Sequence, residues 1–195
     1  MVHEIKDLGV TFDNSMSFIN HIELMLRKSN IMLGFIMRNT QCFSSHKAIT
    51  VLYNSFVRSK LEYASNIWSP YYTKYNIKIE KIQNKFLRYI KFKISDNSDF
   101  NDYQFLREIT GLDTLSNRRI KSDCIFIFKI LNGLIDCNDL LQLINLRVPV
   151  KTTRNQTMFQ VPLTVTNYLY NKPLSRMLRL CNSFEIDWFN SSIKM

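Results

Sequence analysis

The sequence predicts a mainly α-helical protein, built as a small helical bundle with one or two short strands near its two ends and an irregular basic C-terminal extension. Three observations support this class. Apolar residues recur at steps of three, four or seven in several long segments, which is the spacing of one helix face. Strand-like patterns are confined to residues 5–12 and 158–161. Residues 147–179 carry six basic residues, no acidic one and three prolines, which indicates an extended, irregular segment.

The N-terminal segment is expected to contain one strand and one long helix. Residues 5–12 alternate loosely and include β-branched side chains, which fits a short strand. A lone strand is not stable, so it must pair either with a distant short segment or with strands outside this sequence. Asp13, Asn14 and Ser15 then offer capping oxygens for a helix that ends near Asn39.

Residues 51–90 form the stretch around which the rest of the chain is organised. They contain two segments with helical spacing on either side of Trp68-Ser69-Pro70. Proline lacks the N–H that a helix interior requires and disfavours helical geometry in the residue before it, so the first helix must end before Ser69. We therefore predict that Trp68 and Pro70 form a structural joint that sets the angle between two helices, and not a ligand site.

The remaining predicted elements are mostly short. In chain order they are an acidic loop at 95–102, a helix at 103–110 that stops at Gly111, a helix from Ser116 to Gly133, one or two turns at 140–144, a strand at 158–161 and a helix at 174–180.

The composition is that of a folded protein, with 46% hydrophobic and 22% charged residues. No apolar run approaches the ~18 residues of a membrane span, and the N-terminus has no apolar signal core, so we expect no membrane association and a nuclear or cytoplasmic location without secretion. The four cysteines, Cys42, Cys124, Cys137 and Cys181, form no close pair. We therefore expect reduced thiols and no metal site.

Basic residues give the strongest functional signal. The chain carries a formal charge of +10, which favours a polyanionic partner such as nucleic acid. One helix places its basic residues every three or four positions, in a stripe beside its apolar face. We predict that this stripe, together with two arginines farther along the chain, contacts phosphates. The candidate nucleic-acid-binding residues are Lys74, Lys78, Lys81, Lys85, Arg88, Arg118 and Arg119. The alternative is an ordinary solvated helix face.

Signatures of catalysis are missing from the sequence. It contains no glycine-rich phosphate loop, no nucleophile elbow, no H-E-x-x-H and no adjacent aspartate pair of the kind that holds Mg²⁺ in polymerases. Asp96, Asp99 and Asp102 are spaced by three, which is typical of a solvated loop. We expect no catalytic residue and no cofactor in this chain.

A series of short motifs resembles, in order, the reverse transcriptases of non-LTR retrotransposons, in particular the jockey-like group. The N-terminal block is Asp7-Leu8-Gly9-Val10, Phe12-Asp13, Met16-Ser17-Phe18 and His21-Ile22. Later blocks are Leu33-Gly34-Phe35-Ile36, Leu52-Tyr53, Val57-Arg58-Ser59, Leu61-Glu62-Tyr63, Ile67-Trp68-Ser69-Pro70, Ile79-Glu80, Lys85-Phe86, Arg118-Arg119, Lys129-Ile130-Leu131-Asn132-Gly133, Arg176-Met177 and Cys181-Asn182. The resemblance covers most of the chain.

This resemblance implies the region that follows the catalytic palm of an RNA-directed DNA polymerase. Residues 1–13 would be a residual strand at the junction of palm and thumb, 14–95 a thumb-like helical bundle, 96–146 a helical C-terminal region and 147–195 an irregular basic extension. The fingers and palm, with the family's catalytic aspartates and its Mg²⁺, would lie upstream of Met1. The chain alone is then expected to be inactive, and to bind the backbone of template and primer as part of a complete enzyme.

Two alternatives remain open from the sequence. In the first, the chain is a non-binding relic, or a domain reused for protein–protein interaction with amphipathic faces left exposed. Alternatively, Met1 is an artefact of the gene assignment and the product is a full polymerase.

Overall fold

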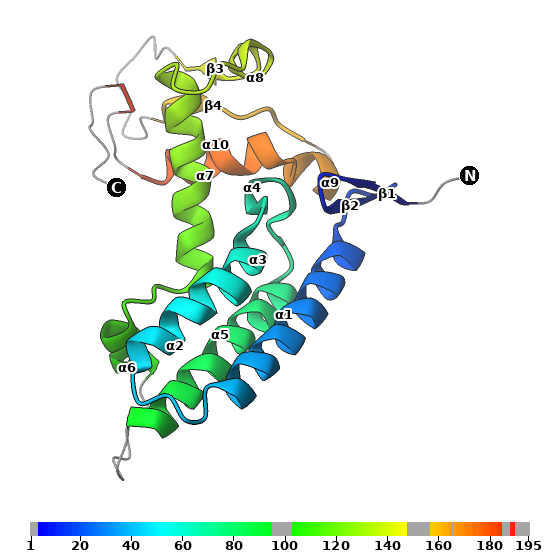
Figure 1. The fold of residues 1–195 in the computed structure, drawn as a ribbon. Coiled ribbons are helices and arrows are strands. Elements are labelled where there is room, and N and C mark those ends of the chain that lie inside the picture. The colour runs from blue at the N-terminus through cyan, green and yellow to red at the C-terminus, as the bar shows by residue number, and fades with distance from the viewer. Residues whose placement is uncertain (1–3, 95–102, 148–156, 165, 185–187, 190–195) are drawn as a thin grey trace. The chain divides into compact units, whose positions relative to one another are not determined.

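The computed structural model describes residues 4–94, 103–147, 157–164, 166–184 and 188–189. The chain is mainly helical, with two small antiparallel strand pairs (Figure 1). Its contacts divide it into two compact units, Met1–Arg119 and Ile120–Met195. The boundary between the two units falls inside a single helix, α7 (Leu115–Leu131). The predicted acidic loop at 95–102 lies outside the described residues.

The first unit begins with a β-hairpin, which corrects the prediction of one strand that pairs with a distant segment or with strands outside this sequence. Strand β1 (Glu4–Asp7) pairs antiparallel with β2 (Val10–Asp13), and Asp7 lies opposite Val10. The two turn residues, Leu8 and Gly9, both have positive φ, at 43° and 87°. This is the backbone of the tight turn that matches the twist of two paired strands. The strand therefore pairs with the segment that directly follows it, within Glu4–Asp13.

Helix α1 (Ile19–Asn39) begins later than predicted and without a side-chain cap. The carboxylate of Asp13 instead holds the preceding turn, since it accepts hydrogen bonds from the backbone N–H and the hydroxyl of Ser17 at 2.8 and 2.7 Å. Phe18, in a left-handed conformation, occupies the cap position. The helix then buries a stripe that includes Leu33, as the helical spacing of its apolar residues predicts.

The next helical segment is broken once more than predicted. Ser45 caps α2 (His46–Tyr53) by accepting from Ala48 N–H, as expected for a serine at this position. The chain continues through a π-helical turn, η1 (Asn54–Arg58), into α3 (Ser59–Glu62).

A left-handed residue, Ala64 with φ 52°, then separates α3 from the short α4 (Ser65–Trp68). Helical structure ends at Trp68, before the proline corner, as predicted. The earlier break at Tyr63 and Ala64 gives no proline or glycine signal in the sequence.

Helix α5 (Thr73–Ile94) is the central helix of the first unit and lies alongside α1 and α2 (Figure 1). The ring of Phe86 stacks on that of Tyr53 with centroids 4.0 Å apart. Helix α6 (Tyr103–Thr110) follows and ends at Gly111, which has the positive φ expected of a residue that terminates a helix. The residues that form the centre of this core are Ile22, Leu33, Ile49, Tyr53, Val57, Leu61, Ile79, Phe86, Leu87 and Ile90.

The second unit contains the rest of α7 and several short elements. Strand β3 (Asn145–Leu146) pairs antiparallel with β4 (Phe159–Gln160). The helices are α8 (Asn138–Gln142), α9 (Asn167–Tyr170) and α10 (Pro173–Asn182). Its buried residues are Ile127, Ile130, Ile144, Phe159, Met177, Leu178, Cys181 and Trp188. The described part of 147–195 therefore supplies much of a hydrophobic core and is not only an irregular extension.

Two polar contacts join α7 to α10 inside this second unit. Arg176 forms an ion pair with the buried Asp123, with 3.3 Å between Nε and Oδ2. The thiol of Cys181 donates a hydrogen bond to Cys124, which lowers the pKa of Cys124 and raises that of Cys181. Both cysteines are free thiols.

Within the described residues, no helix is both long enough and apolar enough to cross a membrane.

The two phenylalanines of α5 test the assignment of its inner face. Phe86 is fully buried, whereas Phe92 is 81% exposed. We expect Phe86→Ala to lower the free energy of unfolding by about 3–5 kcal/mol, because it leaves a cavity under Tyr53. Phe92→Ala removes the same atoms from the solvent side of the same helix and should change it by less than about 0.5 kcal/mol. Urea denaturation followed by circular dichroism measures both, and equal losses would contradict this orientation of α5.

Candidate nucleic-acid interface

The outer face of α5 carries a row of exposed cations. Lys81, Lys85 and Arg88 follow one another at steps of four and three, so they lie on one side of the helix. All three are exposed, while Ile82 and Phe86 on the inner side are buried. No described carboxylate forms an ion pair with any of the three. These side chains therefore present net positive charge to solvent.

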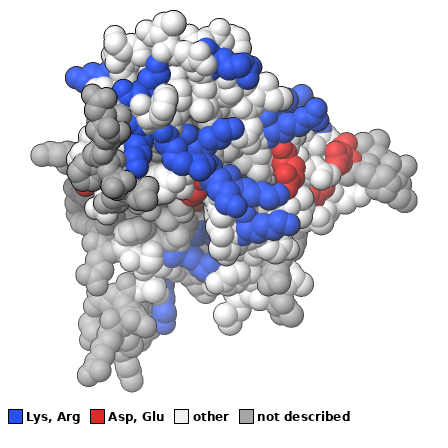
Figure 2. Space-filling view, turned by 90° about the horizontal axis from the view of Figure 1, so that it is seen from below, with Lys and Arg blue, Asp and Glu red and all other residues white. Residues whose placement is uncertain are grey.

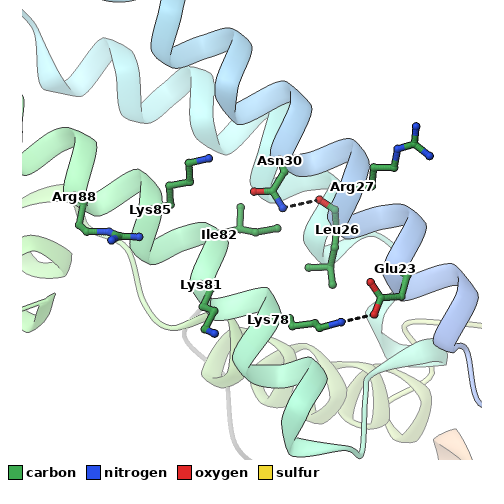
Figure 3. A pocket seen from close by; sticks show the side chains of 9 residues that line it. All are labelled: Glu23, Leu26, Arg27, Asn30, Lys78, Lys81, Ile82, Lys85 and Arg88. Carbon is green, nitrogen blue, oxygen red and sulfur yellow. Dashed lines mark hydrogen bonds and ion pairs between the residues drawn. The ribbon is translucent and has the colours of Figure 1, made fainter.

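These cations line a groove between α5 and α1, which we call the α1–α5 groove. It is open to solvent and has a volume of about 540 Å³. Leu26 of α1 and Ile82 of α5 point toward one another between the two helices and form its apolar floor (Figure 3). Lys85 extends from α5 toward α1, and Arg27 extends outward from α1 at the rim (Figure 3). The groove thus has cations on both helices.

One carboxylate in the groove neutralises part of this charge. Glu23 of α1 forms an ion pair with Lys78 of α5 (Figure 3). The hydrogen bond to Glu23 raises the pKa of Lys78, which also lies 5.1 Å from the centre of the Tyr75 ring. The charge of Lys78 is therefore partly neutralised by Glu23. Lys74 is exposed and lies outside the lining of the groove, with its ammonium 5.9 Å from the same ring.

Arg118 forms a structural ion pair instead of projecting freely into solvent. Its guanidinium donates to both carboxylate oxygens of Glu62, through Nε to Oε1 and through Nη2 to Oε2 at 3.0 Å. This bidentate contact raises the pKa of Arg118 and ties the start of α7 to the end of α3. Bidentate pairs of this kind hold both side chains in a fixed geometry.

Arg119 is buried, which corrects its prediction as a phosphate ligand. It is 3% exposed, and its Nη2 donates to Asn76 Oδ1 at 2.8 Å. The amide of Asn76 in turn donates to the carbonyl of Pro70 at 3.1 Å. Consecutive residues on a helix point about 100° apart, so two adjacent arginines at the start of α7 do not share one face. The inward one belongs to the core of the first unit.

The residues predicted as a joint are packed as a structural role requires. Trp68 is 1% exposed, its Nε1 donates to the carbonyl of Tyr63 at 2.7 Å, and Pro70 is also buried. The neighbouring Tyr71 and Tyr72 are exposed, with ring centroids 4.0 Å apart. Of these four residues, only Tyr71 and Tyr72 are accessible to a ligand.

Sequence reasoning missed the contribution of α1 to the groove. Glu23 and Arg27 are four residues apart on a helix, so they share a face. Their spacing predicts a shared helix face, but it does not predict that this face lies beside the basic stripe of α5. The space-filling view shows Lys and Arg gathered in clusters on one face, with acidic side chains beside some of them (Figure 2).

Neither the described side chains nor the comparisons with known proteins point to another kind of site. Among the residues that the structure describes, no group of three or more His, Cys, Asp or Glu side chains is placed to hold a metal ion. Comparisons with protein families, with curated proteins and with solved structures find no match. Any inference about function therefore rests on the geometry of the α1–α5 groove and on the motifs in the sequence.

Substitution of two arginines tests the division between structural and exposed cations. Arg119→Ala removes a buried hydrogen bond and should lower the free energy of unfolding by about 1–3 kcal/mol. Arg88→Ala removes an exposed cation and should change it by less than about 0.5 kcal/mol. Thermal and urea denaturation of the two variants provide the comparison. Equal stability of the two variants would show that Arg119 has no role in the core.

Proposed function

We propose that this chain is the thumb and downstream region of a non-LTR retrotransposon reverse transcriptase, and that it binds the backbone of an RNA·DNA duplex along the α1–α5 groove. The observation that carries this proposal is the row of Lys81, Lys85 and Arg88, exposed and without acidic partners among the described residues, along one wall of the groove. The ordered motifs of the sequence support the proposed family, and the groove supports the proposed binding mode.

The chemistry of the groove suits phosphate better than bases. Successive cations on α5 lie about 4.5–6 Å apart along the helix axis, and each can contact a phosphate oxygen without reading sequence. The floor consists of Leu26 and Ile82, which offer no hydrogen bond to a base edge. A surface of this kind holds a duplex in register while other parts of an enzyme act on it.

Under this proposal the chain binds the duplex and does not catalyse the reaction. In the family that the motifs resemble, paired aspartates of the palm bind Mg²⁺ and perform polymerisation, and these 195 residues contain no such pair. Catalysis would therefore come from domains outside this sequence. Arg118 and Arg119 do not belong to the proposed contact surface, because Glu62 and the core respectively engage them.

A second candidate function is protein–protein interaction. It is favoured by two large apolar side chains one turn apart on α1, Ile31 at 62% and Phe35 at 55% exposure. Such pairs occur on docking faces of helices. A stable homodimer without any affinity for nucleic acid, observed by analytical ultracentrifugation, would favour this candidate over duplex binding.

Two triple variants with equal loss of charge test the proposed groove. We expect Lys81→Gln, Lys85→Gln and Arg88→Gln together to weaken binding of an RNA·DNA duplex at least about tenfold, and to reduce the log–log salt slope by about 0.9 per lost contact. The matched control is Arg38→Gln, Lys47→Gln and Lys121→Gln, which removes three exposed cations outside the lining of the groove. Fluorescence anisotropy at several salt concentrations measures both. An equal effect of the two triples would mean that net charge alone causes binding.

Glu23 offers a test in the opposite direction. Glu23→Gln removes the negative charge of the groove and releases Lys78, so the duplex should bind more tightly and with about one additional phosphate contact in its salt dependence. Glu108→Gln is the control, because Glu108 is an exposed acid on α6 outside the groove. Unchanged affinity in Glu23→Gln would place the duplex elsewhere.

A further inference from the structure

A second group of basic residues lines a smaller pocket, which we call the hairpin pocket. It has a volume of about 260 Å³ and is lined by residues of β1, its turn, α1 and α3. Its cations are Lys6, Lys28 and Lys60, all exposed. No described carboxylate forms an ion pair with any of them. The pocket therefore concentrates positive charge that described acidic groups do not compensate.

The hairpin pocket and the α1–α5 groove use different residues of α1. The pocket is lined by His21, Leu24, Met25 and Lys28. The groove is lined by Glu23, Leu26, Arg27 and Asn30. The two sets share no residue and point to different flanks of the helix.

A buried histidine supplies a hydrogen-bond donor to the hairpin pocket. His21 is 8% exposed, and its Nδ1 accepts from the backbone N–H of Thr11 at 3.3 Å. Burial, aided by the charge of Lys28, lowers the pKa of His21, so the ring is neutral at pH 7. With Nδ1 acting as an acceptor, the proton of the neutral ring is on Nε2.

That Nε2–H has no hydrogen-bond partner among the described residues, although His21 lines the pocket. The Nε2 atom is not among the fully buried side-chain atoms that lack a partner, so it is accessible from the pocket. An acceptor atom of a ligand in the pocket can therefore accept a hydrogen bond from it.

The remaining wall of the pocket is apolar and includes a fixed aromatic ring. Tyr63 is 56% exposed, yet its hydroxyl is held by a 2.8 Å hydrogen bond to the carbonyl of Leu8. Gly9 lines the pocket beside this ring, where a Cβ would come within 3.7 Å of Tyr63 Cε1. Leu24 adds a side chain that is 41% exposed. An exposed ring that does not need to be ordered on binding suits a planar base.

We infer that the hairpin pocket binds a phosphate monoester that carries a planar base, a nucleoside monophosphate that is either free or at the end of a strand. The phosphate oxygens accept hydrogen bonds from the lysine ammonium groups and from His21 Nε2–H. The base lies against Leu24 and Tyr63. This site does not depend on duplex binding by the α1–α5 groove, because none of its residues lines that groove.

The test is a titration with adenosine 5′-monophosphate, inorganic phosphate and adenosine, followed by the imidazole nitrogen resonances of His21. Before any addition, the spectrum should show the Nε2–H tautomer. Adenosine 5′-monophosphate should shift the Nε2 resonance saturably at millimolar concentration or below, and adenosine should not. Oligonucleotides with and without a 5′-phosphate then distinguish a strand end from the free nucleotide as the source of the phosphate.

Two triple variants with equal loss of charge, one in the hairpin pocket and one in the α1–α5 groove, provide the comparison. Lys6→Gln, Lys28→Gln and Lys60→Gln together should weaken nucleotide binding at least about tenfold, since each charge-assisted hydrogen bond contributes that much. The Lys81, Lys85 and Arg88 triple should leave it within about twofold. Circular dichroism checks that both fold, as expected for exposed positions. Absence of any His21 shift with every phosphate probe, or equal losses in the two triples, would overturn the site, whether or not the duplex binds the groove.

Discussion

Contact between the rings of Tyr53 and Phe86 fixes the position of α5, and the rest of the first unit depends on it. The rings stack at 4.0 Å with an angle of 9° between their planes. Gln83, one turn earlier, accepts from the Tyr53 hydroxyl at 3.3 Å and donates to the carbonyl of Asp113 at 2.9 Å. These contacts join α2, α5 and the segment before α7. Because one face of α5 is held inward, its basic residues are held outward.

Three acidic residues of the first unit determine which of the neighbouring cations stay available. Glu23 engages Lys78, Glu62 engages Arg118, and Glu80 accepts from the backbone N–H of Ser116 at 2.7 Å, where it supports the start of α7. The net charge of +10 is therefore not spread evenly. The α1–α5 groove and the hairpin pocket each contain cations that have no acidic partner among the described residues, and both proposals rest on those cations.

Helical periodicity made α5 and its basic stripe predictable, because burial and charge alternate there with a regular spacing. The hairpin was harder to predict, since its turn places Leu8, a residue with a side chain, at positive φ. Arg119 was predicted to be exposed because the residue type indicates a charge, but it does not indicate whether the side chain points to solvent or to the core. The contribution of the residues after Arg147 to the core of the second unit was missed because these residues lie in short, separate segments. The two binding surfaces need spatial proximity between helices, and no local pattern supplies it.

The salt dependence of duplex binding by the unmodified chain tests the central claim most directly. Four exposed cations line the α1–α5 groove: Lys81, Lys85, Arg88 and Arg27. If they contact phosphates, the logarithm of the association constant for an RNA·DNA duplex should fall linearly with the logarithm of salt concentration, with a slope of about −3 to −4. A slope near zero, or no binding at low salt, would contradict a thumb-like grip on the duplex backbone.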